Sequence, residues 1–196
     1  MSPRPYNLGK RREVIDQGRQ QVLDAARSLL AQPGGSAFTV DAVARRADVA
    51  RATVYYQFGS RSGLLEAVCD HLAELGGLAG LPRAFTEPDP RRGLDLFVGC
   101  FGRFWAADRA ATRRLRALAA LDPEVGAVIA ARDQRRRDGL AVLAGRLPGS
   151  PADQDHLVRV LTALTSFELF DALAGPDQHL TAVVPDVLRL VEAAVR

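Results

Sequence analysis

The sequence predicts an all-α protein, and three observations support this fold class. Ala, Leu and Arg dominate the composition, and runs of β-branched residues are absent, which favours helix over strand. Apolar residues recur at spacings of three and four through most of the 196 residues. Gly- and Pro-rich breaks divide these apolar patterns into segments, and we expect about nine helices.

Residues 1–18 are expected to form a basic, disordered arm. The first nine residues contain two prolines and show no periodicity, and Lys10, Arg11 and Arg12 follow them. Such an arm either contacts a nucleic acid or stays solvated, and the sequence leaves both options open. The first helix begins at about Arg11 or Gln17 and ends at Gln32, before Pro33-Gly34-Gly35.

Two short helices around a tight turn are predicted over residues 39–58. Val40, Val43 and Ala47 mark the apolar face of the first helix, and Thr39 can cap its N-terminus. The second helix runs from about Ala50 to Gln57 and would bury Val54, leaving small, aromatic and polar side chains outward. This layout is typical of a helix-turn-helix whose second helix reads DNA.

The same stretch resembles the N-terminal domain of the TetR family of bacterial transcriptional repressors. The resemblance covers roughly residues 19–68 and departs from the family at Asp48, where Gly is usual, and at Ala50, where Ser or Thr usually caps the second helix. It is carried by Thr39-Val40, Ala44, Ala47-Asp48-Val49, Thr53-Val54-Tyr55-Tyr56-Gln57-Phe58, Ser60-Arg61 and Leu64-Leu65.

From this pattern and the resemblance we expect two groups of DNA contacts. Thr39, Arg51, Tyr55, Tyr56 and Arg61 should position the domain on phosphates, and Ala52, Thr53 and Gln57 should lie closest to base edges.

Charge is distributed unevenly along the chain. Residues 1–62 contain ten basic and five acidic side chains, whereas the remainder contains 16 basic and 18 acidic ones. A basic N-terminal segment followed by a slightly acidic remainder is expected when the N-terminal domain contacts phosphates. We therefore expect double-stranded DNA as a partner.

A connecting helix follows the helix-turn-helix, with Ser60 as its cap and Leu64, Val68 and Leu72 on its apolar face. Gly76-Gly77 ends it, and a linker through Pro88 and Pro90 follows. We therefore expect a DNA-binding domain over residues 19–75 and a ligand-binding and dimerisation domain over residues 76–196.

The second domain reads as a series of further helices. They span Arg91–Ala107, Thr112–Ala120, Pro123 to about Arg146, Ala152–Ala174 and Leu180–Val195. The last two are more apolar than one buried stripe requires, so we expect a homodimer through them, as the resemblance also implies. A dimer would read a palindromic operator.

Aromatic side chains are concentrated on two helices of the second domain. Regulators of the resembled family often bind a small apolar or amphipathic effector between such helices, although aromatic residues at helical spacing also form ordinary cores. The candidate lining residues are Phe97, Cys100, Phe101, Phe104, Trp105, Phe167, Glu168 and Phe170. The arginine-rich run 132–138 reads as a solvated helix face with local ion pairs.

Other classes of function find no support in the sequence. The three histidines are far apart, no phosphate-binding loop or nucleophile elbow occurs, and we expect no cofactor, no metal and no enzyme activity. No apolar run approaches the ~20 residues of a membrane helix, and Cys69 and Cys100 read as reduced core thiols, so a cytoplasmic protein is expected. The remaining alternative is a DNA-binding protein without sequence preference or ligand.

Overall fold

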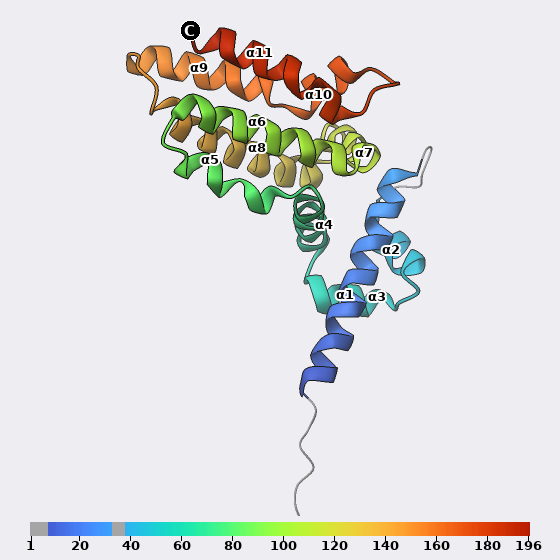
Figure 1. Ribbon diagram of the computed structural model, residues 1–196. Helices are drawn as coiled ribbons and strands as arrows, with labels where there is room; N and C mark the ends of the chain where they lie inside the picture. Colours follow the sequence, from blue (N-terminus) through green and yellow to red (C-terminus); the bar gives the residue numbers. More distant parts are fainter. Residues whose placement is uncertain (1–7, 33–37) are drawn as a thin grey trace, which may run out of the picture. The chain divides into compact units, whose positions relative to one another are not determined.

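The computed structural model describes residues 8–32 and 38–196 and shows an all-helical chain (Figure 1). These residues form eleven α-helices and two short 3-10 helices, rather than the nine helices expected. The chain divides into two compact units, residues 1–68 (unit 1) and residues 69–196 (unit 2). None of the helices in the described ranges has the length and apolar character needed to cross a bilayer.

Unit 1 consists of α1 (Leu8–Ala31), α2 (Val40–Arg46), α3 (Arg51–Phe58) and the first half of α4 (Arg61–Leu75). Its core is built from aliphatic side chains at helical spacing, with Phe38 buried just before α2. The fully buried members of this core are Val22, Ala26, Val43, Leu64, Leu65 and Val68.

Helix α1 begins at Leu8, before either of the expected starts at Arg11 and Gln17, so residues 8–18 of the expected disordered arm are helical. Between Gly9 and Gly18 this stretch consists mostly of Lys, Arg, Glu and Gln, which lose little rotamer freedom in a helix, and α1 continues through both glycines. Residues 1–7 of the expected arm, and the expected stop at Pro33-Gly34-Gly35, lie outside the described residues.

Helix α4 passes from unit 1 into unit 2 without a break. Ser60 caps it, as expected, by accepting a hydrogen bond from the Gly63 N–H at 3.0 Å. Gly77 has a left-handed backbone with φ of 71°, which suits only glycine well and turns the chain away after α4. The stretch expected to be a linker holds η1 (Leu78–Gly80) and α5 (Pro82–Thr86), since Pro82 favours the first helical turn.

Unit 2 is a layered bundle (Figure 1). Helices α6 (Pro90–Ala107) and α8 (Pro123–Ala144) lie under α9 (Pro151–Leu164), α10 (Phe167–Ala174), η2 (Leu180–Val183) and α11 (Val184–Ala194), with α7 (Arg109–Ala119) at one end. Asp89, Asp122 and Ser150 cap α6, α8 and α9 through side-chain oxygens, and a proline follows each cap.

The predicted single helix over residues 152–174 is broken at Thr165–Ser166. The Ser166 hydroxyl accepts a hydrogen bond from the Leu169 N–H at 3.3 Å and thereby starts α10. The Trp105 indole N–H donates to the Thr165 carbonyl at 3.1 Å and satisfies one group exposed by the break. The break accounts for part of the higher helix number.

Candidate nucleic-acid interface and regulatory cavity

The turn between α2 and α3 sets the position of α3. Thr39 accepts a hydrogen bond from the Ala42 N–H at 3.1 Å and so caps α2. In the described part of the chain, Asp48 is the only residue other than glycine with a positive φ, at 52°, a conformation that Asp tolerates better than most residues. Ala50 begins α3 without a side-chain hydrogen bond, as expected from the missing Ser or Thr.

Helix α3 has one buried and one exposed side. Val54 and Phe58 are buried in the core of unit 1. Tyr56 leaves 86% of its surface exposed, which is unusual for so large an aromatic side chain. The exposed residues define the α3 outer face: Arg51, Ala52, Tyr55 and Tyr56.

Three of the expected DNA-contacting residues are less exposed to solvent than the residues of the α3 outer face. Thr53 and Gln57 are half-buried at its edges. Arg61 is also half-buried, and its guanidinium donates to the Phe38 carbonyl at 3.3 Å, close to the start of α2. Thr39, the residue after Phe38, is exposed. All eight expected contacts therefore come from α2, α3 and the first turn of α4.

Arg51 is held on the surface by two neighbours. Its guanidinium lies 3.2 Å from an Asp41 carboxylate oxygen and donates to the Tyr55 hydroxyl at 3.2 Å. The hydrogen bond to Tyr55, and then the charge of Asp41, raise the pKa of Arg51 above its usual range. The side chain is thus a permanent cation whose partner Asp41 would compete with any phosphate for it.

The opposite side of α3 is braced by α1. The Arg19 guanidinium donates to the Gln57 carbonyl at 3.1 Å and lies 4.4 Å from the centre of the Phe58 ring. Gln21 donates to the Ala47 carbonyl at 2.8 Å, at the end of α2. Sequence reasoning counted Arg19 only toward the basic charge, because hydrogen bonds to distant carbonyls leave no local sequence signal.

A cavity of about 240 Å³ lies within unit 2. Helices α4, α6, α7 and α8, together with η1 and Leu81, supply its walls. Most of the wall is apolar: Cys69, Leu72, Ala73, Leu78, Leu81, Phe101, Phe104, Trp105, Leu115 and Ile129. The remaining wall is polar and consists of Thr112, Arg116, Arg132, Asp133, Arg135 and Arg136.

Three of the eight expected ligand contacts, namely Phe101, Phe104 and Trp105, line this cavity. Their rings form one continuous aromatic group, with centroids 4.4 to 6.0 Å apart. The other five lie outside the lining: Phe97, Phe167 and Phe170 in the core, Cys100 buried on α6, and Glu168 exposed on α10. Burial raises the pKa of the Cys100 thiol, which therefore stays protonated.

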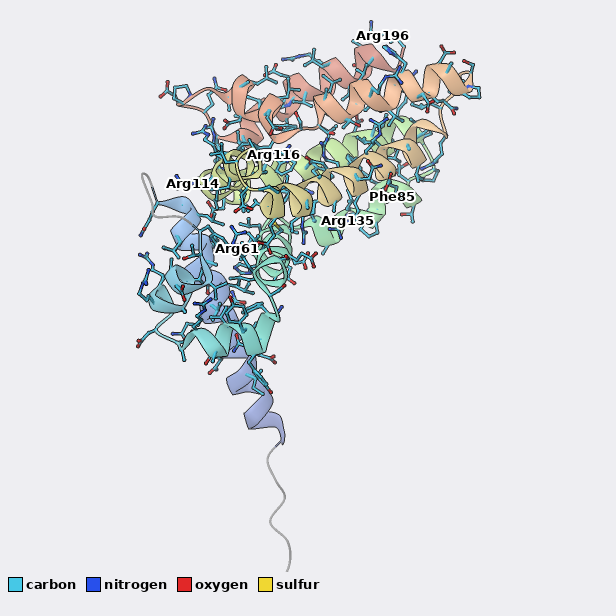
Figure 2. The ribbon with its side chains drawn as sticks, turned by 180° about the vertical axis from the view of Figure 1, so that it is seen from behind. Arg61, Phe85, Arg114, Arg116, Arg135 and Arg196 are labelled. Carbon is cyan, nitrogen blue, oxygen red and sulfur yellow. The ribbon has the colours of Figure 1, made fainter. Side chains whose placement is uncertain are left out.

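Part of the polar wall is an ion-pair network centred on Arg116 (Figure 2 labels Arg116 on α7 and Arg135, which is not part of the network, on α8). Arg116 pairs with Asp133, with an Nη2–Oδ2 distance of 3.0 Å, and with Glu168. Arg136 donates to the Thr162 carbonyl at 2.6 Å and to the Thr165 hydroxyl at 2.7 Å. The network therefore ties α8 to α7, α9 and α10.

The prediction that residues 132–138 form a solvated face is wrong for the side that carries Arg132, Asp133 and Arg136. Only 6% of the surface of Arg136 is exposed to solvent, and all three residues line the cavity. Together with Ile129 they occupy positions i, i+3, i+4 and i+7, the spacing of one helix face. That spacing was visible in the sequence, but a charged face is usually a solvent face.

Comparison with known proteins agrees with this arrangement. Residues 22–68 match the family described as bacterial regulatory proteins, tetR family. Over 56 residues the chain is 46% identical to the HTH-type transcriptional regulator AlkX of Mycobacterium tuberculosis, a stretch covering 29% of this chain and 26% of that protein. Over 81 residues it is 35% identical to the HTH-type transcriptional regulator BetI of Paraburkholderia phytofirmans, covering 41% and 42% of the two chains. The matches thus span less than half of either relative.

Solved structures extend the similarity to the whole fold. A TetR-like transcriptional regulator from Rhodococcus sp. RHA1 superposes with a TM-score of 0.65 at 23% identity, covering 97% of both chains. The fatty acid degradation regulator FadR from Bacillus halodurans superposes with a TM-score of 0.59 at 17% identity, covering 90% of this chain and 99% of that one. At these identities the comparison establishes the fold alone.

Proposed function

We propose that this chain is a transcriptional repressor of the TetR family of bacterial regulatory proteins and that it binds operator DNA through the α3 outer face. The observation that carries the proposal is the exposure of Tyr56, at 86%, beside Arg51 and the small Ala52, on a helix whose other side is buried. A helix of this kind places short side chains against base edges and aromatic or cationic ones on the backbone.

The proposed contacts follow from where each side chain lies. Arg51, Tyr55 and Tyr56, on the α3 outer face, reach phosphates, and Ala52 approaches a base edge, where its methyl group fits a thymine methyl. Thr53 and Gln57 contact bases from the edges of this face. Thr39 and Arg61, at the starts of α2 and α4, contact the flanking phosphates.

We further propose a homodimer that reads a palindrome, with the last helices of two chains in contact. Two-fold symmetry places two α3 helices in successive major grooves, roughly 34–36 Å apart. Leu173 on α10 and Leu190 on α11 support this proposal, because each leaves more than 40% of its surface exposed.

A small apolar or amphipathic effector is proposed to occupy the cavity of unit 2 and to release the operator. Cys69, Leu72 and Ala73 belong to the cavity wall and to α4, the helix whose first half is part of unit 1. A ligand that shifts α4 changes the placement of α3. By linkage, bound operator must weaken effector binding by the same factor.

The test is selection of binding sites from a random DNA duplex library by the purified protein. The wild-type chain should enrich one palindromic sequence, with affinity that falls steeply as salt increases. Tyr56→Ala should weaken binding to that sequence at least tenfold. Leu121→Ala serves as a matched control, because Leu121 is 84% exposed but belongs to unit 2.

Two results would count against the proposal. Enrichment of no sequence, with equal affinity for all duplexes, would indicate the alternative, an architectural DNA-binding protein. Equal binding by wild type and Tyr56→Ala would show that the α3 outer face is not the reading surface.

A further inference from the structure

The cavity of unit 2 carries more positive than negative charge on its polar wall. Four arginines line it, at positions 116, 132, 135 and 136, against one carboxylate, Asp133. Two acids outside the lining, Asp70 and Glu168, pair with Arg132 and Arg116 respectively. The lining itself therefore carries four cations and one anion, and Asp70 and Glu168 reach two of these cations from outside it.

Arg135 and Arg136 are the lining arginines with the weakest pairing to an acid. Arg135 makes no hydrogen bond or ion pair with any residue that the structure describes. Arg136 shares Asp133 with Arg116, and its distance to that carboxylate, 3.4 Å, is the longer of the two. Asp133 is thus chiefly the partner of Arg116, and α8 presents two guanidinium groups without an anion of their own.

Arg136 is the more informative of the two arginines. Only 4% of its side-chain surface is exposed, and its Nε–H finds no hydrogen-bond partner in the described residues. Burial lowers the pKa of Arg136, while Asp133 partly offsets that effect. A buried cation with an unsatisfied donor is costly unless an anion completes its environment.

The rest of the wall restricts which anion fits. The surfaces from α4, η1 and α6 are apolar and include the rings of Phe101, Phe104 and Trp105. A strongly hydrated anion such as free phosphate gains nothing from these rings, and a wholly apolar molecule leaves the arginines uncompensated. The volume, about 240 Å³, suits a compact body with one charged group.

We propose that the cavity binds an amphipathic carboxylate, with its apolar body against α4 and α6 and its carboxylate against Arg135 and Arg136 of α8. The planar guanidinium group pairs well with a carboxylate, which makes arginine the appropriate residue for this wall. The inference rests on the proposed function, because it names the chemical class of the effector.

Direct binding to the full chain without DNA tests the inference separately from operator recognition. Isothermal titration calorimetry would compare decanoate with decan-1-ol, which has the same chain length but no charge, and with acetate, which has no apolar body. We expect decanoate to bind at least tenfold more tightly than decan-1-ol, and acetate not to bind. Comparable binding of decanoate and decan-1-ol, or no binding of either, would overturn the inference.

Two arginine variants locate the carboxylate. Arg135→Gln should weaken decanoate binding about tenfold and leave decan-1-ol binding unchanged, because Arg135 makes no hydrogen bond or ion pair with the described residues and glutamine keeps much of its length. Arg137→Gln is the matched control, since Arg137 also lies on α8 but does not line the cavity. Wild-type affinity for decanoate in Arg135→Gln would contradict the placement, and a failed operator selection alongside intact decanoate binding would contradict only the proposed function.

Discussion

Ala50 occupies the N-cap position of α3 but provides no side-chain hydrogen bond to cap the helix. Its φ and ψ, −65° and 143°, lie in the extended region typical of an N-cap, and its methyl side chain offers no acceptor. The Thr53 N–H donates to the Ala50 carbonyl at 2.9 Å, so the N–H groups of Arg51 and Ala52 are the ones that depend on solvent. The start of the proposed reading helix is thus weakly held.

Ala50→Ser should stabilise unit 1, because a hydroxyl at this exposed position can accept from the first turn of α3. The expected gain in the free energy of unfolding is about 0.5–2 kcal/mol, measured by urea denaturation. Ala130→Ser, at an exposed position within α8, should instead cost about 0.5 kcal/mol, because serine is a poorer helix former than alanine. A gain at both positions, or at neither, would show that capping is not the cause.

At the scale of elements, α7 is fastened to the α10 end of the bundle by a cluster of hydrogen bonds. Arg109 donates to an Asp171 carboxylate oxygen at 2.6 Å and to the Gly175 carbonyl at 2.5 Å. Arg113 donates to both oxygens of the same carboxylate, at 2.7 and 3.1 Å. One aspartate thus joins two turns of α7 to α10.

The pKa of Asp171 predicts how this link responds to acid. Partial burial alone would raise that pKa, but hydrogen bonds from Arg113 and Arg109 outweigh it, and the pKa is lowered. A carboxyl group with a lowered folded-state pKa stabilises the fold above its unfolded pKa, about 3.9, and loses this contribution as the pH falls below that value.

Asp171→Asn should therefore destabilise the protein at pH 7, and the difference from wild type should shrink as the pH falls below about 4. Urea denaturation across this pH range is the measurement. Asp186→Asn is the control, because Asp186 forms only an exposed pair with Arg189 on the same helix and should change stability little. A pH-independent loss in Asp171→Asn would indicate packing as the cause.

At the scale of the whole molecule, two of the exposed leucines in the described residues, Leu173 and Leu190, lie on α10 and α11, and the others lie on α4, on α6 and directly after α7. A leucine gains about 1.5–3 kcal/mol when it passes from full exposure to full burial, so covering the partly exposed Leu173 and Leu190 of two chains contributes to association without offsetting its entropic cost alone. Single exposed apolar residues elsewhere are common on protein surfaces. The proposed dimer depends on the leucines of α10 and α11.

Leu190→Arg should therefore convert a dimer to a monomer, as measured by sedimentation velocity over a range of protein concentrations. Operator affinity should fall with it, because each α3 then binds alone. Val142→Arg is the control, since Val142 is 57% exposed but lies on α8. Dissociation by the control variant alone would place the interface on α8.

The helix-turn-helix could be predicted from the sequence because its signals are local. Thr39 and Ser60 cap the helices that follow them, and Val54 and Phe58 repeat at helical spacing. The braces from Arg19 and Gln21 could not be predicted, since they join side chains to carbonyls 38 and 26 residues away. Their partners are defined only once α1 has packed on the helix-turn-helix.

The cavity was harder to predict than the helices that form it. Among the aromatic side chains at helical spacing, Phe101, Phe104 and Trp105 line the cavity, whereas Phe97 and Phe170 lie in the core. Only packing decides which rings leave space between them. The arginines of α8 were assigned to solvent because burial of charge depends on partners from other helices, namely Thr162 and Thr165 of the α9 end.

Because α4 runs unbroken from unit 1 into unit 2, the number of residues in this helix fixes the rotation between its two halves. An α-helix turns about 100° per residue, so one residue inserted after Val68 would rotate everything beyond it by that angle. Four inserted residues would lengthen the helix by about 6 Å and rotate it by only about 40°. A chimera that exchanges the DNA-binding unit for another must therefore be joined in register along α4, whatever the sequences on either side.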